Sequence, residues 1–155
     1  MKSVKEQVNC LFVYPEFSQF SFWNTKEAIQ ASGARATTPP LGLLTVAAIL
    51  PQHWNFRLLD LNAFDFNEED WQWADIICTG GMLPQQEGIC DVIKKANIDG
   101  KFVCVGGPDP TSQPDIYSSA DALVLNEGEI TIPLWLESWE NGKPSGTFSN
   151  EEKPD

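Results

Sequence analysis

The chain has 155 residues, a length that suits one domain with a hydrophobic core of its own. Apolar residues make up 42% of the chain and charged residues 21%, which excludes a generally disordered protein. The 22 acidic residues outnumber the 10 basic residues, and the formal net charge of -12 disfavours nucleic acids and anionic membranes as partners.

Neither a secretory signal nor a stretch long enough to span a membrane occurs in the sequence, so the expected location is cytoplasmic. Short apolar runs recur along the chain, and longer segments bounded by proline or glycine separate several of them. The runs lack strict alternation, which is typical of strands covered on both faces. The predicted strands cover residues 8–14, 56–61, 74–80, 101–107 and 121–128, and the predicted helices cover residues 40–51, 83–100 and 129–142. This order predicts an α/β fold with a doubly wound, five-stranded parallel sheet between two helical layers.

Two segments interrupt the alternation of strands and helices. Residues 15–39 form a long first crossover whose early part, "PEFSQFSFWN", is rich in aromatic residues and has no clear period. A loop of this length in a compact domain is usually functional or disordered. Residues 143–155 are rich in Gly, Pro, Ser and acidic residues. The sequence therefore predicts a domain over residues 1–142 and a linker over residues 143–155.

The four cysteines, Cys10, Cys78, Cys90 and Cys104, are dispersed along the chain. No two of them have the Cys-x-x-Cys spacing of a metal site, so no zinc or iron–sulfur centre is expected within this chain. Three of them lie inside apolar runs, where we expect buried, reduced thiols that pack as small apolar side chains.

Glycine follows three of the predicted strands. Gly80-Gly81 ends the third strand, Gly106-Gly107 ends the fourth, and Glu127-Gly128-Glu129 follows the fifth. Because the carboxyl ends of parallel strands meet at one edge of a sheet, we expect these loops to lie together. Glycines in such loops either allow backbone amides to approach a ligand or only supply turns, and the sequence leaves both roles open.

The nucleotide-binding and catalytic motifs that this topology often carries are missing. No Gly-x-Gly-x-x-Gly follows the first strand, and no Gly-x-x-x-x-Gly-Lys-Ser/Thr occurs. No serine lies in a Gly-x-Ser-x-Gly elbow. The only histidine, His53, lies between a helix and the next strand, at the edge of the sheet opposite the expected ligand edge. The sequence thus predicts no catalytic residue, and we expect the chain to bind a ligand rather than to catalyse a reaction alone.

Four segments taken together resemble one family. "PPLGLLTVAAILP", "ADIICTGGMLPQQ", "KFVCVGGPDPTS" and "ADALVLNEGEITIPLWLE" resemble, in this order, the N-terminal cobalamin (vitamin B12)-binding domain of radical S-adenosylmethionine (SAM) proteins. The resemblance covers about residues 8–140. The 27 positions between Thr79 and Gly106 are similar to the spacing between a hydroxyl residue and a Gly-Gly pair in such domains.

The resemblance implies a flavodoxin-like or Rossmann-like fold, with cobalamin as the cofactor. Many cobalamin domains place a cobalt-binding histidine after the first strand, but residues 14–38 contain none, so the resemblance implies cobalamin without a protein histidine ligand. It implies no catalytic residue and no metal ligand in this chain. The residues that it assigns to cofactor binding are Tyr14, Pro15, Thr79, Gly80, Gly81, Met82, Leu83, Gly106, Gly107, Pro108, Asp109, Glu127 and Gly128.

The resemblance also implies a longer enzyme. Radical SAM proteins hold SAM and a [4Fe-4S] cluster in a barrel domain that carries Cys-x-x-x-Cys-x-x-Cys, and this motif is absent here. The chain would then present the corrin to a barrel domain of the same polypeptide, in a methyltransferase or a related radical enzyme. The alternative is a docking module of such an enzyme that has kept the fold and lost the cofactor.

Overall fold

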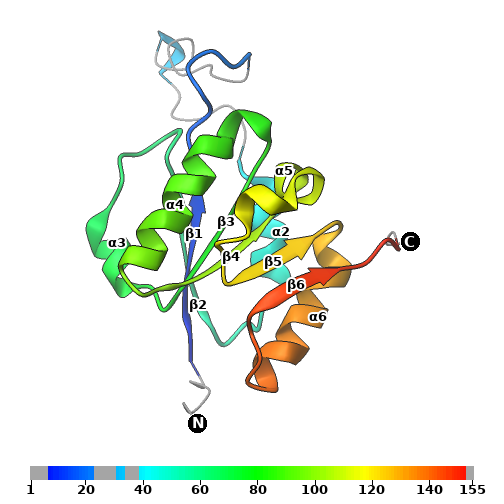
Figure 1. Cartoon of the computed structure of the whole chain (residues 1–155). Coiled ribbons are helices and arrows are strands. Elements are labelled where there is room, and N and C mark those ends of the chain that lie inside the picture. Colours follow the sequence, from blue (N-terminus) through cyan, green and yellow to red (C-terminus); the bar gives the residue numbers. More distant parts are fainter. Residues whose placement is uncertain (1–6, 23–30, 34–38, 153–155) are drawn as a thin grey trace.

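Six parallel strands form one sheet in the computed structural model, which describes residues 7–22, 31–33 and 39–152 (Figure 1). In chain order the strands are β1 (Asn9–Tyr14), β2 (Asn55–Asp60), β3 (Ile76–Gly80), β4 (Phe102–Gly106), β5 (Ala122–Leu125) and β6 (Gly146–Ser149). In space their order is β2-β1-β3-β4-β5-β6, and every neighbouring pair is parallel. The predicted doubly wound α/β fold is confirmed.

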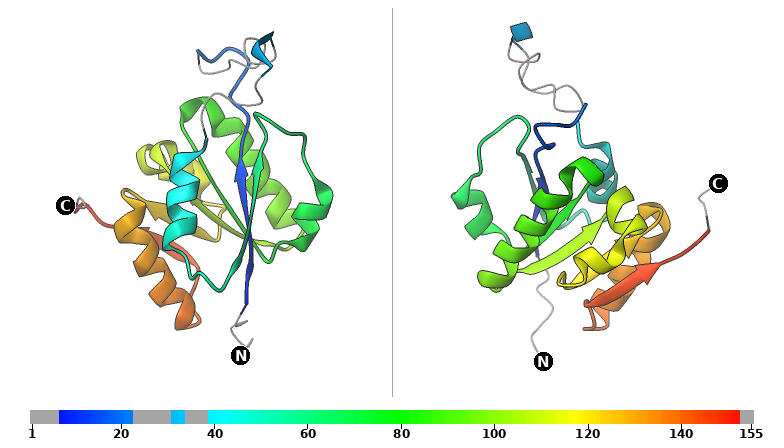
Figure 2. Two further views of the ribbon diagram at one scale, coloured as in Figure 1. Left: turned by 180° about the vertical axis from the view of Figure 1, so that it is seen from behind. Right: turned by 45° about the horizontal axis from the view of Figure 1, so that its top comes forward.

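Helices cover both faces of the sheet and complete three layers (Figures 1 and 2). They are α2 (Leu41–Ile49), α3 (Glu68–Trp73), α4 (Gln86–Ile98), α5 (Pro108–Ser112) and α6 (Gly128–Glu140), with short 3-10 helices η1 (Leu83–Gln85) and η2 (Pro114–Tyr117). α4 lies on one face, and α2 and α6 lie on the other. Within the described ranges, no helix combines the length and the apolar character that crossing a membrane requires.

The sixth strand corrects the predicted number of five. β6 lies within residues 143–155, the segment predicted as a linker, and pairs with β5 from Ala122↔Gly146 to Leu125↔Ser149. It has four residues at the edge of the sheet, and of these only Phe148 is partly buried. Such a short, exposed edge strand lacks the apolar run by which inner strands are predicted.

Alternation along the inner strands divides the core into two clusters. Ile77 and Val105 belong to the cluster beneath α4, whereas Cys78 and Cys104 belong to the cluster beneath α2 and α6. α4 buries four residues at helical spacing: Ile89, Val92, Ile93 and Ala96. α2 has no fully buried residue. The sheet is therefore covered more loosely by α2 than by α4.

Strands β3, β4 and β5 approach one another closely at their carboxyl ends. A Cβ atom added at Gly80 would lie 2.1 Å from the backbone oxygen of Gly106, and one added at Gly106 would lie 2.6 Å from the backbone oxygen of Val124. Both distances are shorter than nonbonded atoms tolerate. The sheet itself therefore requires glycine at both positions, whatever binds at this edge.

We expect Gly80→Ala to lower the free energy of unfolding by about 1–3 kcal/mol, because the added methyl group must displace the backbone of β4. Gly42→Ala is the matched control, since a Cβ atom there would meet nothing within 4 Å and alanine favours the helix α2. Urea denaturation followed by circular dichroism measures both. An undiminished stability of Gly80→Ala would contradict the close approach of these strands.

Candidate functional site

The carboxyl edge of the sheet contains the position where the chain reverses its direction of winding. β1 lies between β2 and β3, so the chain goes to one side of β1 after the first strand and to the other side after the second. The connections that leave β1 and β3 therefore diverge. Parallel α/β sheets bind ligands in the crevice outside the strand ends at such a position.

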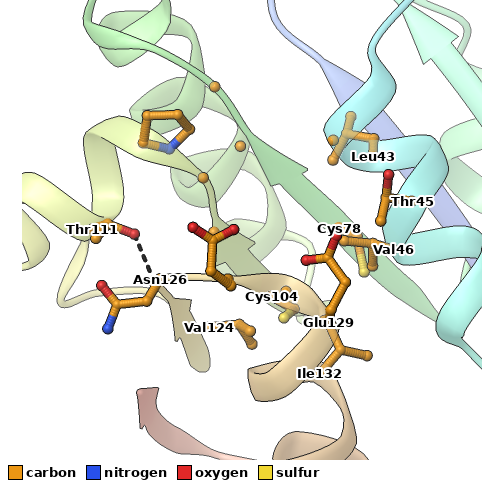
Figure 3. A pocket seen from close by; sticks show the side chains of 18 of the residues that line it. Leu43, Thr45, Val46, Cys78, Cys104, Thr111, Val124, Asn126, Glu129 and Ile132 are labelled. Carbon is orange, nitrogen blue, oxygen red and sulfur yellow. Dashed lines mark hydrogen bonds between the residues drawn. The ribbon is translucent and has the colours of Figure 1, made fainter. Parts of the chain in front are cut away.

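A cavity of about 760 Å³ lies at this edge, between α2 and the first turns of α6 (Figure 3). Cys78, Cys104 and Val124, from three neighbouring strands, form its base, while Val46 of α2 and Ile132 of α6 line its sides. Its volume falls within the range of roughly 300–1,000 Å³ that is typical of small-molecule sites.

Most of the residues predicted to bind a cofactor line this cavity: Tyr14, Thr79, Gly80, Gly81, Met82, Gly106, Gly107, Pro108, Glu127 and Gly128. Pro15, Leu83 and Asp109 do not line it. The carbonyl of Pro15 accepts hydrogen bonds from Gln85 at 2.7 Å and Asn62 at 3.1 Å, and Leu83 is largely exposed. The structure thus brings the strand-end motifs together, and their role toward a cofactor stays a prediction.

The two glycine pairs contact each other and form one rim of the cavity. Gly107 has a φ of +103°, and a Cβ atom there would lie 3.0 Å from the backbone nitrogen of Gly81. The N–H of Asp109 donates a hydrogen bond to the carbonyl of Gly81 at 3.1 Å. Glycine at position 107 is therefore required by its backbone conformation and by the neighbouring loop.

Asp109 holds the start of α5 behind this rim. It is 4% exposed, and its carboxylate accepts hydrogen bonds from the Tyr117 hydroxyl, from Gln86 at 2.9 Å and from Gln113 at 3.0 Å. Burial alone would raise the pKa of Asp109, but these hydrogen bonds outweigh it and hold the pKa below its usual value. Burial and the Asp109 carboxylate raise the pKa of Tyr117. The hydrogen bonds from Tyr117, Gln86 and Gln113 therefore fix Asp109 behind the rim. Sequence analysis did not identify these three donors.

Thr79 lines the cavity and has a buried hydroxyl group without a partner. The residue is 2% exposed, and among the described residues its Oγ1 atom makes no hydrogen bond. Leaving a buried hydroxyl unpaired costs about 1–3 kcal/mol. Thr79 is in register with Val13 and Val105, which belong to the cluster beneath α4, so its side chain lies on the face of the sheet opposite the base of the cavity. The structure therefore does not direct the Thr79 hydroxyl at a ligand in the cavity.

Three buried thiols lie on the cavity face of the sheet. Cys10 of β1, Cys78 of β3 and Cys104 of β4 are free, and Cys10 Sγ donates to Cys78 Sγ at 3.5 Å. The hydrogen bond with Cys78, together with burial, raises the pKa of Cys10 and of Cys104. The prediction of buried, free thiols in the apolar runs is confirmed. Within the described part of the chain, no group of three or more His, Cys, Asp or Glu side chains could hold a metal ion.

Sequence analysis did not assign α2 to the site. Leu43, Thr45 and Val46 of this helix line the cavity opposite the glycine rim. The one signal in the sequence is that residues 39–51 contain no charged side chain, which is unusual for a helix beside solvent. The Trp-rich helix α6 was predicted, but Glu129 and Ile132 were not assigned to a site.

Comparison with known proteins identifies relatives named as methyltransferases. The chain is 43% identical over 150 residues to an uncharacterized methyltransferase of Synechocystis sp., a match that covers 96% of this chain and 28% of that protein. It is 36% identical over 100 residues to a hopanoid C-2 methylase of Rhodopseudomonas palustris, which covers 64% of this chain and 19% of that protein. No protein-family model matches the chain. The chain is thus similar to part of each enzyme and spans less than a third of their length.

We expect Asp109→Asn to lower the free energy of unfolding at pH 7 by about 1–3 kcal/mol, because a neutral amide replaces a carboxylate that accepts three hydrogen bonds. The pKa of Asp109 is lower in the folded state than in the unfolded state, where it is about 3.9. The carboxylate therefore stabilises the fold fully above the unfolded-state pKa, and this stabilisation is lost as the pH falls through the folded-state pKa. The variant should therefore lose less stability than the wild type on acidification below about pH 4.

Urea denaturation at a series of pH values measures this difference. Asp115→Asn is the control, since Asp115 is exposed and lies six residues away in η2. Equal acid dependence of Asp109→Asn and the wild type would show that the hydrogen bonds to Asp109 do not set its pKa.

Proposed function

We propose that this chain is the cobalamin-binding part of a radical SAM methyltransferase, and that the cavity at the carboxyl edge of the sheet receives the cofactor. The observation that carries the proposal is a cavity of about 760 Å³ bounded by the strand-end motifs of β3, β4 and β5. The two relatives named as a methyltransferase and a methylase support the reaction class.

The residues around the cavity suit the chemistry of cobalamin. Corrin is a broad, flat ring with many neutral amide arms, so it favours apolar surface and nearby backbone groups over a clamp of charged side chains. The base formed by Cys78, Cys104 and Val124 offers apolar surface, and Gly81 and Gly107, which line the cavity, carry no side chains of their own. The chemistry of the site is therefore compatible with this cofactor.

Each part of the site has a distinct role in this proposal. The glycine rim would approach the cofactor with backbone groups, and Val46 and Ile132 would pack against it. Bound cobalamin supplies the cobalt centre through which a methyl group is transferred. SAM and the [4Fe-4S] cluster would belong to the part of the enzyme outside this chain.

The proposal assigns no protein ligand to cobalt. None of the described residues that line the cavity is a histidine, and His53 lies in the connection from α2 to β2, at the amino end of the strands. This position agrees with cobalamin bound without a protein histidine.

A cofactor-free docking module is the second candidate, and two observations bear on it. Gly80 and Gly106 are required by the backbones of neighbouring strands, so the glycine pairs alone do not argue for a ligand. Leu41 and Leu44 of α2 are exposed and offer apolar surface to another domain. The experiment below separates the two candidates.

We expect the chain to take up hydroxocobalamin, with a shift in the corrin absorbance and co-elution of the cofactor in gel filtration. Val46→Trp should abolish uptake because the larger ring fills the cavity, whereas Ala48→Trp, on the exposed side of the same helix, should leave uptake unchanged. Circular dichroism confirms that both variants fold. No uptake by the wild type at high micromolar cobalamin, or equal uptake by both variants, would overturn the proposal.

We expect Thr79→Val to keep or raise the free energy of unfolding, by up to about 1 kcal/mol, because it removes an unpaired buried hydroxyl at nearly constant volume. The same variant should bind hydroxocobalamin with unchanged affinity, because the Thr79 side chain lies on the α4 face of the sheet and the base of the cavity lies on the other face. Thr131→Val is the control, since the Thr131 hydroxyl donates to the Glu127 carbonyl at 3.0 Å and its removal should lower stability. Weaker binding by Thr79→Val would show that the Thr79 hydroxyl contacts the cofactor.

A further inference from the structure

Two of the buried thiols on the α2 and α6 face of the sheet line the cavity itself. Cys78 of β3 and Cys104 of β4 are each 5% exposed and belong to its base (Figure 3), whereas Cys10 of β1 is fully buried and does not line it. Leu41 and Glu127 line the cavity as well and are exposed, so the cavity opens to solvent. A small molecule that enters it therefore reaches Cys78 and Cys104.

Cys78 is the thiol of this cluster that loses its proton most readily. Cys10 Sγ donates to Cys78 Sγ at 3.5 Å, and hydrogen bonds from Cys10 and Cys104 hold the pKa of Cys78 well below its usual value, although burial opposes them. The same hydrogen bonds, together with burial, raise the pKa of Cys10 and of Cys104. Because the thiolate is the nucleophilic form of cysteine, Cys78 is the nucleophile of the cluster and its neighbours are the donors.

The register of the sheet places Cys78 directly beside Cys104 and diagonally from Cys10. Cys78 is paired with Cys104, on strands that lie about 4.8 Å apart. Cys10 is paired with Ile76, two residues before Cys78, and this offset separates the Cα atoms of Cys10 and Cys78 by about 8 Å. Disulfides join Cα atoms that are roughly 4.4–6.8 Å apart. The backbone therefore favours a bond from Cys78 to Cys104 over one to Cys10.

We propose that Cys78 is a modification site for small hydroperoxides, such as hydrogen peroxide, that enter the cavity, and that Cys104 converts the oxidised Cys78 into a Cys78–Cys104 disulfide. A thiol that is accessible, forms a thiolate and lies next to a second thiol is typical of redox-sensing cysteines. The reaction uses only the thiols of this chain and needs no cobalamin.

The oxidation consumes one molecule of hydrogen peroxide. The Cys78 thiolate attacks one peroxide oxygen, the O–O bond breaks, and the leaving hydroxide takes up the proton that Cys78 had released, which gives a sulfenic acid and water. The sulfur of Cys104 then attacks the Cys78 sulfur, the S–O bond breaks, and the Cys104 proton leaves with the hydroxyl group as a second water. Two thiols lose two electrons and two protons, and the peroxide is reduced to two waters.

The test treats the reduced chain with hydrogen peroxide in the absence of cobalamin. Remaining thiols are blocked with a maleimide at successive times, and mass spectrometry of the peptides follows each cysteine. We expect a Cys78–Cys104 disulfide, and oxidation of Cys78 about tenfold faster than that of Cys90, because burial and the carboxylates of Asp91 and Asp109 raise the pKa of Cys90. Cys90 is the internal control, since it is more exposed than Cys78.

In guanidinium chloride, where the fold is lost, Cys78 and Cys90 should react at similar rates. In the folded chain, oxidation of Cys90 before Cys78, or no oxidation of Cys78, overturns the proposal. Because the reaction is measured without cobalamin, failure of the chain to bind cobalamin overturns the proposed function and leaves this inference standing.

A serine variant tests the role of Cys104. Cys104→Ser should stop the reaction at the sulfenic acid of Cys78, which dimedone traps, whereas Cys90→Ser should form the disulfide as the wild type does. Circular dichroism confirms that both variants fold. A Cys10–Cys78 disulfide in the wild type, or a disulfide of Cys78 in Cys104→Ser, would show that Cys104 is not the second thiol.

The route of the oxidant is tested by closing the cavity. Val46→Trp places a large ring in the cavity and should slow the oxidation of Cys78 about tenfold, whereas Ala48→Trp, on the exposed side of α2, should leave the rate unchanged. Equal rates in the two variants would contradict entry of the oxidant through the cavity.

Discussion

The close approach of three backbones at the carboxyl ends of β3, β4 and β5 governs the geometry of this molecule. Gly80 and Gly106 point toward carbonyl oxygens of the adjacent strand at distances where no side chain fits. This contact lets the two glycine loops meet through Gly81 and Gly107, and it brings the amide of Asp109 within hydrogen-bonding distance of the β3 loop. The rim of the cavity is thus an outcome of sheet packing and exists before any ligand arrives.

The two faces of the sheet are filled by different means. On the α4 face, a helix with apolar residues at helical spacing closes the core over Ile77 and Val105. On the other face, α2 contributes small and medium side chains and buries none of them fully, while Trp135 and Trp139 of α6 fill the amino end near Trp54. The bulky rings fill that end of the layer, and the cavity lies at the opposite, carboxyl end. The position of the cavity follows from this uneven distribution of side-chain volume.

The sequence predicted the fold class because each inner strand is a continuous apolar run bounded by turn residues. β6 could not be predicted, since a four-residue edge strand whose residues are mostly exposed differs little in composition from a linker. The spacing of Thr79 and Gly106 pointed to the edge of the sheet where the cavity lies, but it could not give the reason for the glycines, which lies in atoms of neighbouring strands. The hydrogen-bond partners of Asp109 could not be predicted either, because Gln86 and Tyr117 come from two other helices and only the tertiary fold brings them together.

The cavity supports a bound cofactor more strongly than the glycines do. Gly80, Gly106 and Gly107 improve packing or relieve strain in the protein alone, so they would be needed in a docking module as well. The cavity has the opposite effect, because unfilled apolar volume destabilises a fold. A feature that costs stability in the free protein needs a compensating interaction elsewhere, and a ligand that fills the volume supplies one.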